Sequence, residues 1–181
     1  KQPGVDCIKA YKVNLDGTTE YVGQIENIEW NGIEPLSCEP HSILLEDGRI
    51  LTHIRVQHYG EKKLFTIYQS VSIDEGRTWS KPEPVLSELG GAPPHIMKHS
   101  SGVLICTYGY REKPYGIRAM FSYDNGETWD VDHDLYINGV NGDLGYPSTV
   151  ELNDGSLITV FYGHLSEEEP AVILQQKWRM E

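Results

Sequence analysis

The chain has 181 residues and a formal net charge of −12, which argues against nucleic acid as a partner because phosphate binding requires a basic surface. Its composition, 39% hydrophobic and 23% charged, is that of an ordinary globular protein, and 18 glycines with 10 prolines suit many turns. No apolar run approaches the roughly 18 residues of a membrane span. Three widely spaced cysteines exclude a full disulfide framework, and the spacing of cysteines, histidines and carboxylates indicates neither a metal site nor a cofactor.

The first 30 residues have the pattern of a β-hairpin. Two runs with alternating apolar side chains, residues 7–13 and 21–28, flank a turn segment at 15–19 that contains Asp16 and Gly17. This arrangement predicts two antiparallel strands joined by a tight turn. We interpret residues 1–30 as the outer strands of a sheet whose first strands are missing.

A repeat with a period near 50 follows the hairpin. Residues 45–51, 99–105 and 152–158 match one another, and their turn glycines, Gly48, Gly102 and Gly155, recur after 54 and 53 residues. Each glycine lies between a short apolar run and a longer β-branched or aromatic run, which is typical of a hairpin. A period of this length built from strands indicates propeller blades of about four strands each.

The repeat divides the rest of the chain into three expected blades, at residues 38–86, 92–137 and 143–181. We expect strands near 40–45, 49–58, 64–72 and 79–85 in the first blade, and near 95–99, 103–110, 117–122 and 129–136 in the second. The third expected blade begins at Tyr146, continues through 156–163 and ends with a strand over 171–179. Helical periodicity is almost absent, so the sequence predicts an all-β fold.

A second repeat, offset from the first, occupies residues 72–79 (Ser-Ile-Asp-Glu-Gly-Arg-Thr-Trp) and 122–129 (Ser-Tyr-Asp-Asn-Gly-Glu-Thr-Trp). The shared pattern suits a tight turn in which the Asp accepts backbone hydrogen bonds and the Gly adopts a positive φ. This is the pattern of the Asp-box, or BNR, repeat. The chain therefore resembles the sialidase (neuraminidase) superfamily of β-propellers, in which these boxes lie far from the active site.

The resemblance implies a six-bladed sialidase-like β-propeller, of which residues 1–181 supply about three to three and a half blades. An open part of a ring exposes strand edges and apolar blade faces, so we expect the C-terminal half of a longer protein. The remaining blades would come from an upstream segment or, alternatively, from a second chain. No signal peptide is present and the chain starts with Lys1 rather than Met, so secreted, periplasmic and cytoplasmic locations are all compatible with it.

The chemistry of the sialidase family explains its site residues. Three Arg hold the carboxylate of the sugar, a Tyr–Glu pair supplies the nucleophile, and an Asp acts as acid and base. A neutral Tyr avoids the repulsion that an anionic nucleophile would meet at an anomeric carbon bearing a carboxylate. A phenol with a pKa of about 10 then needs a neighbouring base. Paired guanidinium–carboxylate hydrogen bonds fix the substrate and offset its charge.

Four residues occur in the order that the second half of such a site follows. The resemblance implies that Glu39 is the base, that Arg55 and Arg118 bind the carboxylate, and that Tyr146 is the nucleophile. Arg118 interrupts an apolar strand, where a charge is costly unless it is paired. Alternatives stay open, because Glu34 offers a second Glu-Pro carboxylate and either Arg could form a structural ion pair instead.

Three further residues, Arg111, His95 and Asp143, are expected at the same end of the propeller and are candidate substrate contacts, although His95 could also be a satisfied loop histidine. The family's first Arg, in an Arg-Ile-Pro setting, and its acid/base Asp have no match. We expect both upstream of Lys1, so that this chain alone holds half a site and would be inactive by itself.

The intact protein is therefore expected to be an exo-α-sialidase-like retaining glycosidase whose partner is a sialylated or other anionic glycan. One alternative is an Asp-box propeller hydrolase or lyase that acts on another anionic sugar, such as a uronic acid. A second alternative, from a different class, is a non-catalytic carbohydrate-binding propeller. A shared fold does not by itself decide between these functions.

Overall fold

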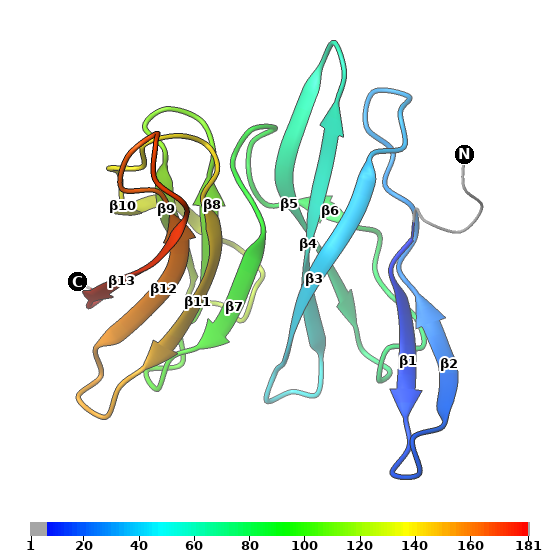
Figure 1. Ribbon diagram of the computed structural model, residues 1–181. Helices are drawn as coiled ribbons and strands as arrows, with labels where there is room; N and C mark the ends of the chain where they lie inside the picture. Colours follow the sequence, from blue (N-terminus) through cyan, green and yellow to red (C-terminus); the bar gives the residue numbers. More distant parts are fainter. Residues whose placement is uncertain (1–6, 181) are drawn as a thin grey trace.

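The computed structural model describes residues 7–180 and shows an all-β chain, as the sequence predicts (Figure 1). Within that range the strands form four antiparallel sheets, and no helix is present. Residues 1–6 and 181 lie outside the described residues, including the first part of the expected hairpin region. In each sheet the strands are paired in the order in which they follow one another in the sequence.

The first sheet is the hairpin of β1 (Lys9–Val13) and β2 (Thr19–Gln24). In its turn, the backbone N–H of Thr18 donates a 3.0 Å hydrogen bond to Asp16 Oδ1. The Asp-Gly turn beginning at Asp47 has the same backbone hydrogen bonds. The turn at 15–19 therefore belongs structurally with the turn glycines of the first repeat and not with the Asp-boxes.

The second sheet contains β3 (Leu36–Leu44), β4 (Ile50–Tyr59), β5 (Lys63–Ser72) and β6 (Glu83–Pro84). The first of these strands begins earlier than the predicted position near residue 40. The last is much shorter than the predicted strand over 79–85. Pro82 and Pro84 explain the shortening, because proline has no backbone N–H to donate to a neighbouring strand.

The third sheet contains β7 (Pro94–Lys98), β8 (Leu104–Tyr110), β9 (Gly116–Ser122) and β10 (Asp130–Tyr136). The fourth contains β11 (Gly145–Glu151), β12 (Leu157–Gly163) and β13 (Val172–Trp178). The first strands of these three sheets, β3, β7 and β11, lie side by side, so the sheets are arranged around a common edge (Figure 1).

The core lies between the faces of neighbouring sheets. The largest buried cluster joins the second sheet to the third through Leu51, Ile67, Ile96, Leu104 and Met120. Strands β4 and β8 are buried along most of their length; β8 reads as a largely apolar run in the sequence, whereas β4 also buries Thr52, His53 and Arg55. Burying apolar surface at about 25 cal/mol per Å² is the main term that holds such sheets together.

The two Asp-box turns connect the third and fourth strands of their sheets, at the lower end in Figure 1. In the second box, Asp124 Oδ1 accepts a hydrogen bond from the backbone N–H of Thr128 at 2.9 Å and from the Ser122 hydroxyl at 2.8 Å. Gly126 has a φ of +87° and donates its N–H to the Ser122 hydroxyl. The first box has the equivalent bonds. The boxes are thus structural turns at the end opposite to the starts of β3, β7 and β11.

Candidate functional site

Three side chains that are far apart in the sequence meet near the starts of β3 and β11. The hydroxyl of Tyr146 donates a 2.6 Å hydrogen bond to Oε1 of Glu39. The Nη1 atom of Arg55 lies 2.8 Å from Oε2 of the same carboxylate and 3.2 Å from the Tyr146 hydroxyl. One carboxylate therefore contacts both a phenol and a guanidinium. The structure brings together Glu39, Arg55 and Tyr146, three of the four main candidates from the sequence. The carboxylate in this contact is Glu39 and not the alternative, Glu34.

Glu39 and Tyr146 share an uncommon backbone conformation. Their φ angles are 50° and 49°, and each lies where a β-bulge shifts the register of its strand. Each also precedes a proline, Pro40 or Pro147, which ordinarily favours an extended conformation in the residue before it. A non-glycine residue with such a φ costs roughly 1–3 kcal/mol. The bulges re-aim the two side chains toward each other, an arrangement common beside active sites.

Arg55 lies in the middle of β4 and is 7% exposed. Gln57 accepts hydrogen bonds from its Nε and Nη2 atoms, and the guanidinium carbon lies 4.9 Å from the centre of the Phe65 ring. Burial opposes the charge of Arg55, but the hydrogen bond and charge of Glu39 outweigh burial and raise its pKa. Because Gln57 is neutral, it orients the guanidinium without reducing its charge.

Arg111 reaches the same aromatic ring from the segment after β8. Its guanidinium carbon lies 5.2 Å from the centre of the Phe65 ring. Its Nε donates to the Leu144 carbonyl at 3.1 Å, and its Nη2 lies 3.4 Å from the Tyr162 hydroxyl. Among residues 7–180, Arg111 forms no ion pair within 4 Å. Neutral groups therefore hold a half-buried charge in place, which leaves that charge available to an anionic ligand.

A second tyrosine–carboxylate pair lies beside the first. The Tyr162 hydroxyl donates a 2.7 Å hydrogen bond to Oδ1 of Asp143, and Oδ2 of Asp143 is 3.1 Å from Nε2 of His164. The rings of Tyr162 and Tyr146 are 6.0 Å apart. Burial, followed by the hydrogen bond to Asp143, raises the pKa of Tyr162 to about 12. Asp143 thus reaches the site through Tyr162, a residue that the sequence analysis did not single out.

His95, in β7, lies next to the Tyr146–Glu39 pair. These three residues help to line a hollow of about 220 Å³ whose other walls include four prolines. The Nδ1 atom of His95 accepts a 3.3 Å hydrogen bond from the backbone N–H of Thr149, and the His95 ring is 4.6 Å from the ring of His41. Burial, with a smaller contribution from His41, lowers the pKa of His95 to about 4. The imidazole is therefore uncharged near neutral pH.

Arg118 is placed differently from the sequence expectation. It lies on β9 and forms ion pairs with Asp132 and Asp134 of the outermost strand β10, at 3.0 and 2.9 Å. Its guanidinium carbon lies 3.5 Å from the centre of the Tyr110 ring. None of these partners belongs to the Tyr146 cluster. The geometry corresponds to the structural ion pair that the sequence analysis left open as the alternative role.

The surroundings of Tyr146 keep its hydroxyl protonated. The hydrogen bond to Glu39, followed by burial and by the charge of that carboxylate, raises the pKa of Tyr146, whereas Arg55 opposes the shift. The phenolic proton points at Glu39 Oε1 across a 2.6 Å hydrogen bond. The arrangement can therefore transfer a proton from the phenol to the carboxylate at the moment when the phenolic oxygen forms a bond.

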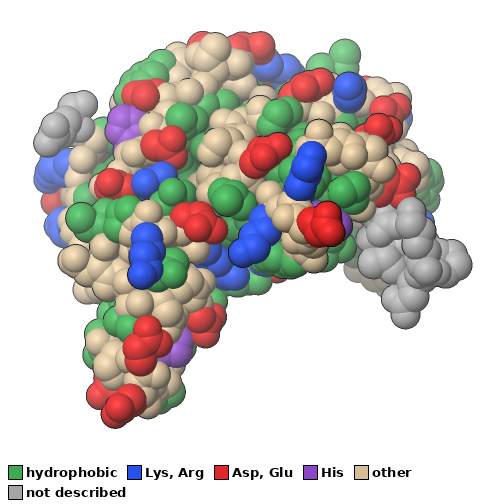
Figure 2. Space-filling model, turned by 90° about the horizontal axis from the view of Figure 1, so that it is seen from above, with side chains coloured by type: hydrophobic (Ala, Val, Ile, Leu, Met, Phe, Trp, Pro, Cys, Tyr) green, Lys and Arg blue, Asp and Glu red, His purple; other side chains and the backbone are tan. Residues whose placement is uncertain are grey.

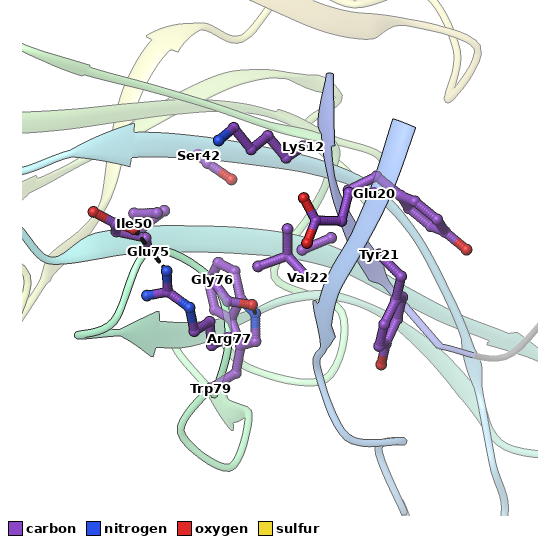
Figure 3. A pocket seen from close by; sticks show the side chains of 12 residues that line it. Lys12, Glu20, Tyr21, Val22, Ser42, Ile50, Glu75, Gly76, Arg77 and Trp79 are labelled. Carbon is purple, nitrogen blue, oxygen red and sulfur yellow. Dashed lines mark hydrogen bonds and ion pairs between the residues drawn. The ribbon is translucent and has the colours of Figure 1, made fainter. Parts of the chain in front are cut away.

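A larger hollow lies elsewhere in the described part of the chain. It has a volume of about 960 Å³ and separates the β1–β2 hairpin from the first Asp-box, with Lys12, Glu20, Glu75 and Arg77 among its lining residues (Figure 3). It shares no lining residue with the Tyr146 cluster. Its walls come from the hairpin, from the Asp-box and from β3 and β4, and they carry no convergent acid, base and nucleophile, so we assign the site by its chemistry and not by volume.

Charged side chains of both signs are interspersed on the end of the molecule seen in Figure 2. The protein as a whole is acidic, so attraction of an anionic ligand depends on the nearby charges of Arg55 and Arg111 and not on the net charge. Among the described residues, no group of three or more His, Cys, Asp or Glu side chains is placed to hold a metal ion. In the same part of the chain, no helix is long and apolar enough to cross a membrane.

Comparisons with known proteins identify the fold. No protein-family model matches the chain, and no curated protein matches it in sequence. A solved structure of a protein of unknown function from Dyadobacter fermentans is similar over 90% of this chain, with a TM-score of 0.76 and 22% identity. The Hadza microbial sialidase Hz136 is similar over 86%, with a TM-score of 0.63 and 15% identity. A thermostable family-43 glycoside hydrolase is similar over 98%, with a TM-score of 0.61 and 14% identity.

These similarities show that the four sheets are part of a β-propeller-type fold that also occurs in glycan-active proteins, and we therefore describe the sheets as blades. At such identities they establish the fold alone. The present chain spans 42% of the Dyadobacter protein, 35% of the sialidase and 69% of the family-43 hydrolase. The function therefore has to be argued from the site.

Proposed function

We propose that this chain supplies the nucleophile side of the active site of a retaining exo-glycosidase. Its substrate is a glycan that ends in sialic acid or in a related 2-keto acid sugar. The observation that carries the proposal is the 2.6 Å hydrogen bond from the Tyr146 hydroxyl to Glu39, with Arg55 in contact with both groups. A tyrosine nucleophile is the sialidase exception to the usual pair of glycosidase carboxylates.

The first step forms a bond between the Tyr146 oxygen and the anomeric carbon and breaks the bond from that carbon to the leaving-group oxygen. The phenolic proton passes to Glu39 Oε1, and the leaving-group oxygen takes a proton from an acid outside this cluster. In the second step, water attacks the anomeric carbon and breaks its bond to the Tyr146 oxygen, which recovers its proton from Glu39, while the acid deprotonated in the first step takes the proton that water loses. Two displacements at one carbon retain its configuration.

Arg55 and Arg111 are the carboxylate-binding pair in this proposal, and Arg111 takes the place that the sequence analysis gave to Arg118. Arg55 and Arg111 both lie against the Phe65 ring, and Arg111 forms no ion pair among the described residues. The charge of Arg118 is already offset by two carboxylates on β10. Two guanidinium groups that share one ring can hold a planar carboxylate between them.

A propeller that binds or cleaves another anionic sugar is the second candidate. A family-25 polysaccharide lyase bound to a glucuronic-acid-containing saccharide has a related fold, with a TM-score of 0.52 and 13% identity. The same two Arg would hold a uronate carboxylate. A lyase abstracts a proton and forms no bond between Tyr146 and the sugar, whereas a non-catalytic binding propeller shows no turnover and keeps its affinity when Tyr146 loses its hydroxyl.

The test is hydrolysis of a fluorogenic sialoside by the full natural polypeptide that contains this sequence. We expect Tyr146→Phe to reduce turnover at least about a thousandfold without unfolding the protein, because the nucleophile is lost. Tyr123→Phe is the control, since Tyr123 is exposed in the second Asp-box at the opposite end. Full activity of Tyr146→Phe, or no activity in the folded natural protein, would contradict the proposal.

A further inference from the structure

A third hollow, with a volume of about 270 Å³, opens beside Arg111. Its walls come from the β4–β5 hairpin, from the loop after β6 and from the segment that follows β8. They include Tyr59, Lys63, Phe65, Leu89, Arg111 and Glu112. This volume is close to the lower end of the roughly 300–1,000 Å³ typical of small-molecule sites, which suits about one sugar ring.

The hollow adjoins the Tyr146 cluster through two residues of its wall. Phe65 contacts Arg111, which lines the hollow, and also Arg55 of the cluster. The hydroxyl of Tyr59 donates a 3.4 Å hydrogen bond to Gln57, the residue that holds the Arg55 guanidinium. Because Arg111 lines the hollow and contacts Tyr162 beside Tyr146, a ligand whose carboxylate binds Arg111 can reach into the hollow.

The lining combines apolar surfaces with charge. Tyr59 and Leu89 offer an aromatic and an aliphatic face, which suit the C–H face of a sugar ring, while Phe65, which is 6% exposed, lies against Arg111. Lys63 and Arg111 bring two positive charges, and neither forms an ion pair among the described residues. In a chain with a net charge of −12, Lys63 and Arg111 outnumber the one carboxylate of this lining, Glu112, and Lys63 stays available to a second anionic group when Arg111 holds the terminal carboxylate.

We propose that this hollow is a second sugar subsite and that it takes a unit carrying an anionic group, either a carboxylate or a sulfate. This inference rests on the proposed function and specifies its substrate class: a glycan in which the unit next to the terminal acidic sugar is itself acidic. Lys63 binds the second anionic group. Glu112 lines the same hollow, and its negative charge repels an anionic group. Lys63 and Glu112 therefore have opposite effects on the affinity for such a ligand.

The experiment measures binding to the full natural polypeptide by calorimetry, with Tyr146→Phe present throughout to prevent turnover. The probes are the methyl α-glycoside of sialic acid, sialyllactose with a neutral second unit, disialic acid with a second carboxylate, and a sialoside of 6-sulfogalactose with a sulfate. We expect disialic acid or the sulfated probe to bind about fivefold or more tightly than sialyllactose. Whichever of the two binds tighter identifies the second anionic group.

The variants make the test specific. Lys63→Gln is expected to lower the ratio of acidic-probe to sialyllactose affinity about fivefold, Lys63→Arg to restore it, and Glu112→Gln to raise it. Lys62→Gln is the matched control, because the neighbouring Lys62 is exposed and does not line the hollow. An unchanged ratio in Lys63→Gln, with the methyl glycoside still bound, overturns the subsite alone. A natural protein that binds none of the probes overturns the proposed function and the subsite with it.

Discussion

Replacing Arg111 and Arg118 separately distinguishes a ligand-binding arginine from a structural one. In Arg111→Gln, the protein loses a guanidinium that only neutral groups and an aromatic ring hold in place. A charge-assisted hydrogen bond contributes about 1.5–3 kcal/mol. Losing the paired bonds to a ligand carboxylate should therefore weaken binding by about 3 kcal/mol, or roughly a hundredfold. The free energy of unfolding should change by less than about 1 kcal/mol, because no ion pair within the described residues is broken.

Arg118→Gln should show the reverse pattern. It removes ion pairs to Asp132 and Asp134, whose carboxylates are about half exposed, and each such pair contributes about 0.2–1 kcal/mol. It also removes the stacking on Tyr110, which is worth about 0.5–2 kcal/mol. The expected loss is about 1–4 kcal/mol of unfolding free energy, with no change in ligand affinity.

Both variants are compared with the natural protein by calorimetric binding of 2,3-didehydro sialic acid, which keeps the carboxylate, and by urea unfolding. The reasoning is refuted if Arg118→Gln weakens binding as strongly as Arg111→Gln does. It is also refuted if Arg111→Gln keeps full affinity while its fold is intact. In either case, the ion pairs of Arg118 and their absence at Arg111 within the described residues would not account for the roles of these two residues.

Two further predictions concern the fold. Ser122→Ala removes the hydroxyl that bonds both Asp124 and the Gly126 N–H at 2.8 Å, so urea unfolding should show a loss of about 1–2 kcal/mol; a loss no larger than that of the exposed Ser87→Ala would contradict this role. Burial lowers the pKa of His53 to about 4, against about 6.5 when unfolded, so the unfolded chain binds the proton first as pH falls. The contribution of His53 to stability should decrease by up to roughly 3 kcal/mol from pH 6.5 to 4, and His53→Gln should remove that part of the slope and leave the part from His95, whose pKa is also about 4; an equal slope in the variant would contradict it.

The sequence contained enough information to predict the sheets and to select Glu39, Arg55 and Tyr146, which meet in the structure. Repeated turns mark the ends of strands directly, so the period of the glycines predicted the three sheets that follow the hairpin. A further repeat was overlooked: Pro40, Pro94 and Pro147 recur after 54 and 53 residues, at matching places in β3, β7 and β11. Glu39 and Tyr146 each stand directly before one of these prolines. This spacing favours Glu39 over Glu34, the other Glu-Pro carboxylate of the sequence.

The roles of Arg111 and Arg118 were harder to tell apart from the sequence. A charge inside an apolar strand, as at Arg118, indicates only that a partner exists. For Arg118 that partner is on the adjacent strand, where Asp130, Asp132 and Asp134 alternate along β10. This pattern was visible in the sequence and could have identified the ion pair. The partners of Arg111 are a ring in β5, a carbonyl before β11 and a hydroxyl in β12. Such contacts depend on how blades pack and leave no local pattern in the sequence.

The central claim is that Tyr146 becomes covalently bonded to the sugar, and trapping that bond tests it most directly. The full natural polypeptide is treated with 2,3-difluorosialic acid, in which the 3-fluorine slows the second displacement, and its peptides are mapped by mass spectrometry. We predict a fluorosialyl adduct on Tyr146 that forms more slowly in Glu39→Gln, where the base is lost, and is absent in Tyr146→Phe. An adduct on any other residue, or sialoside hydrolysis with inverted configuration and no adduct, would contradict the account.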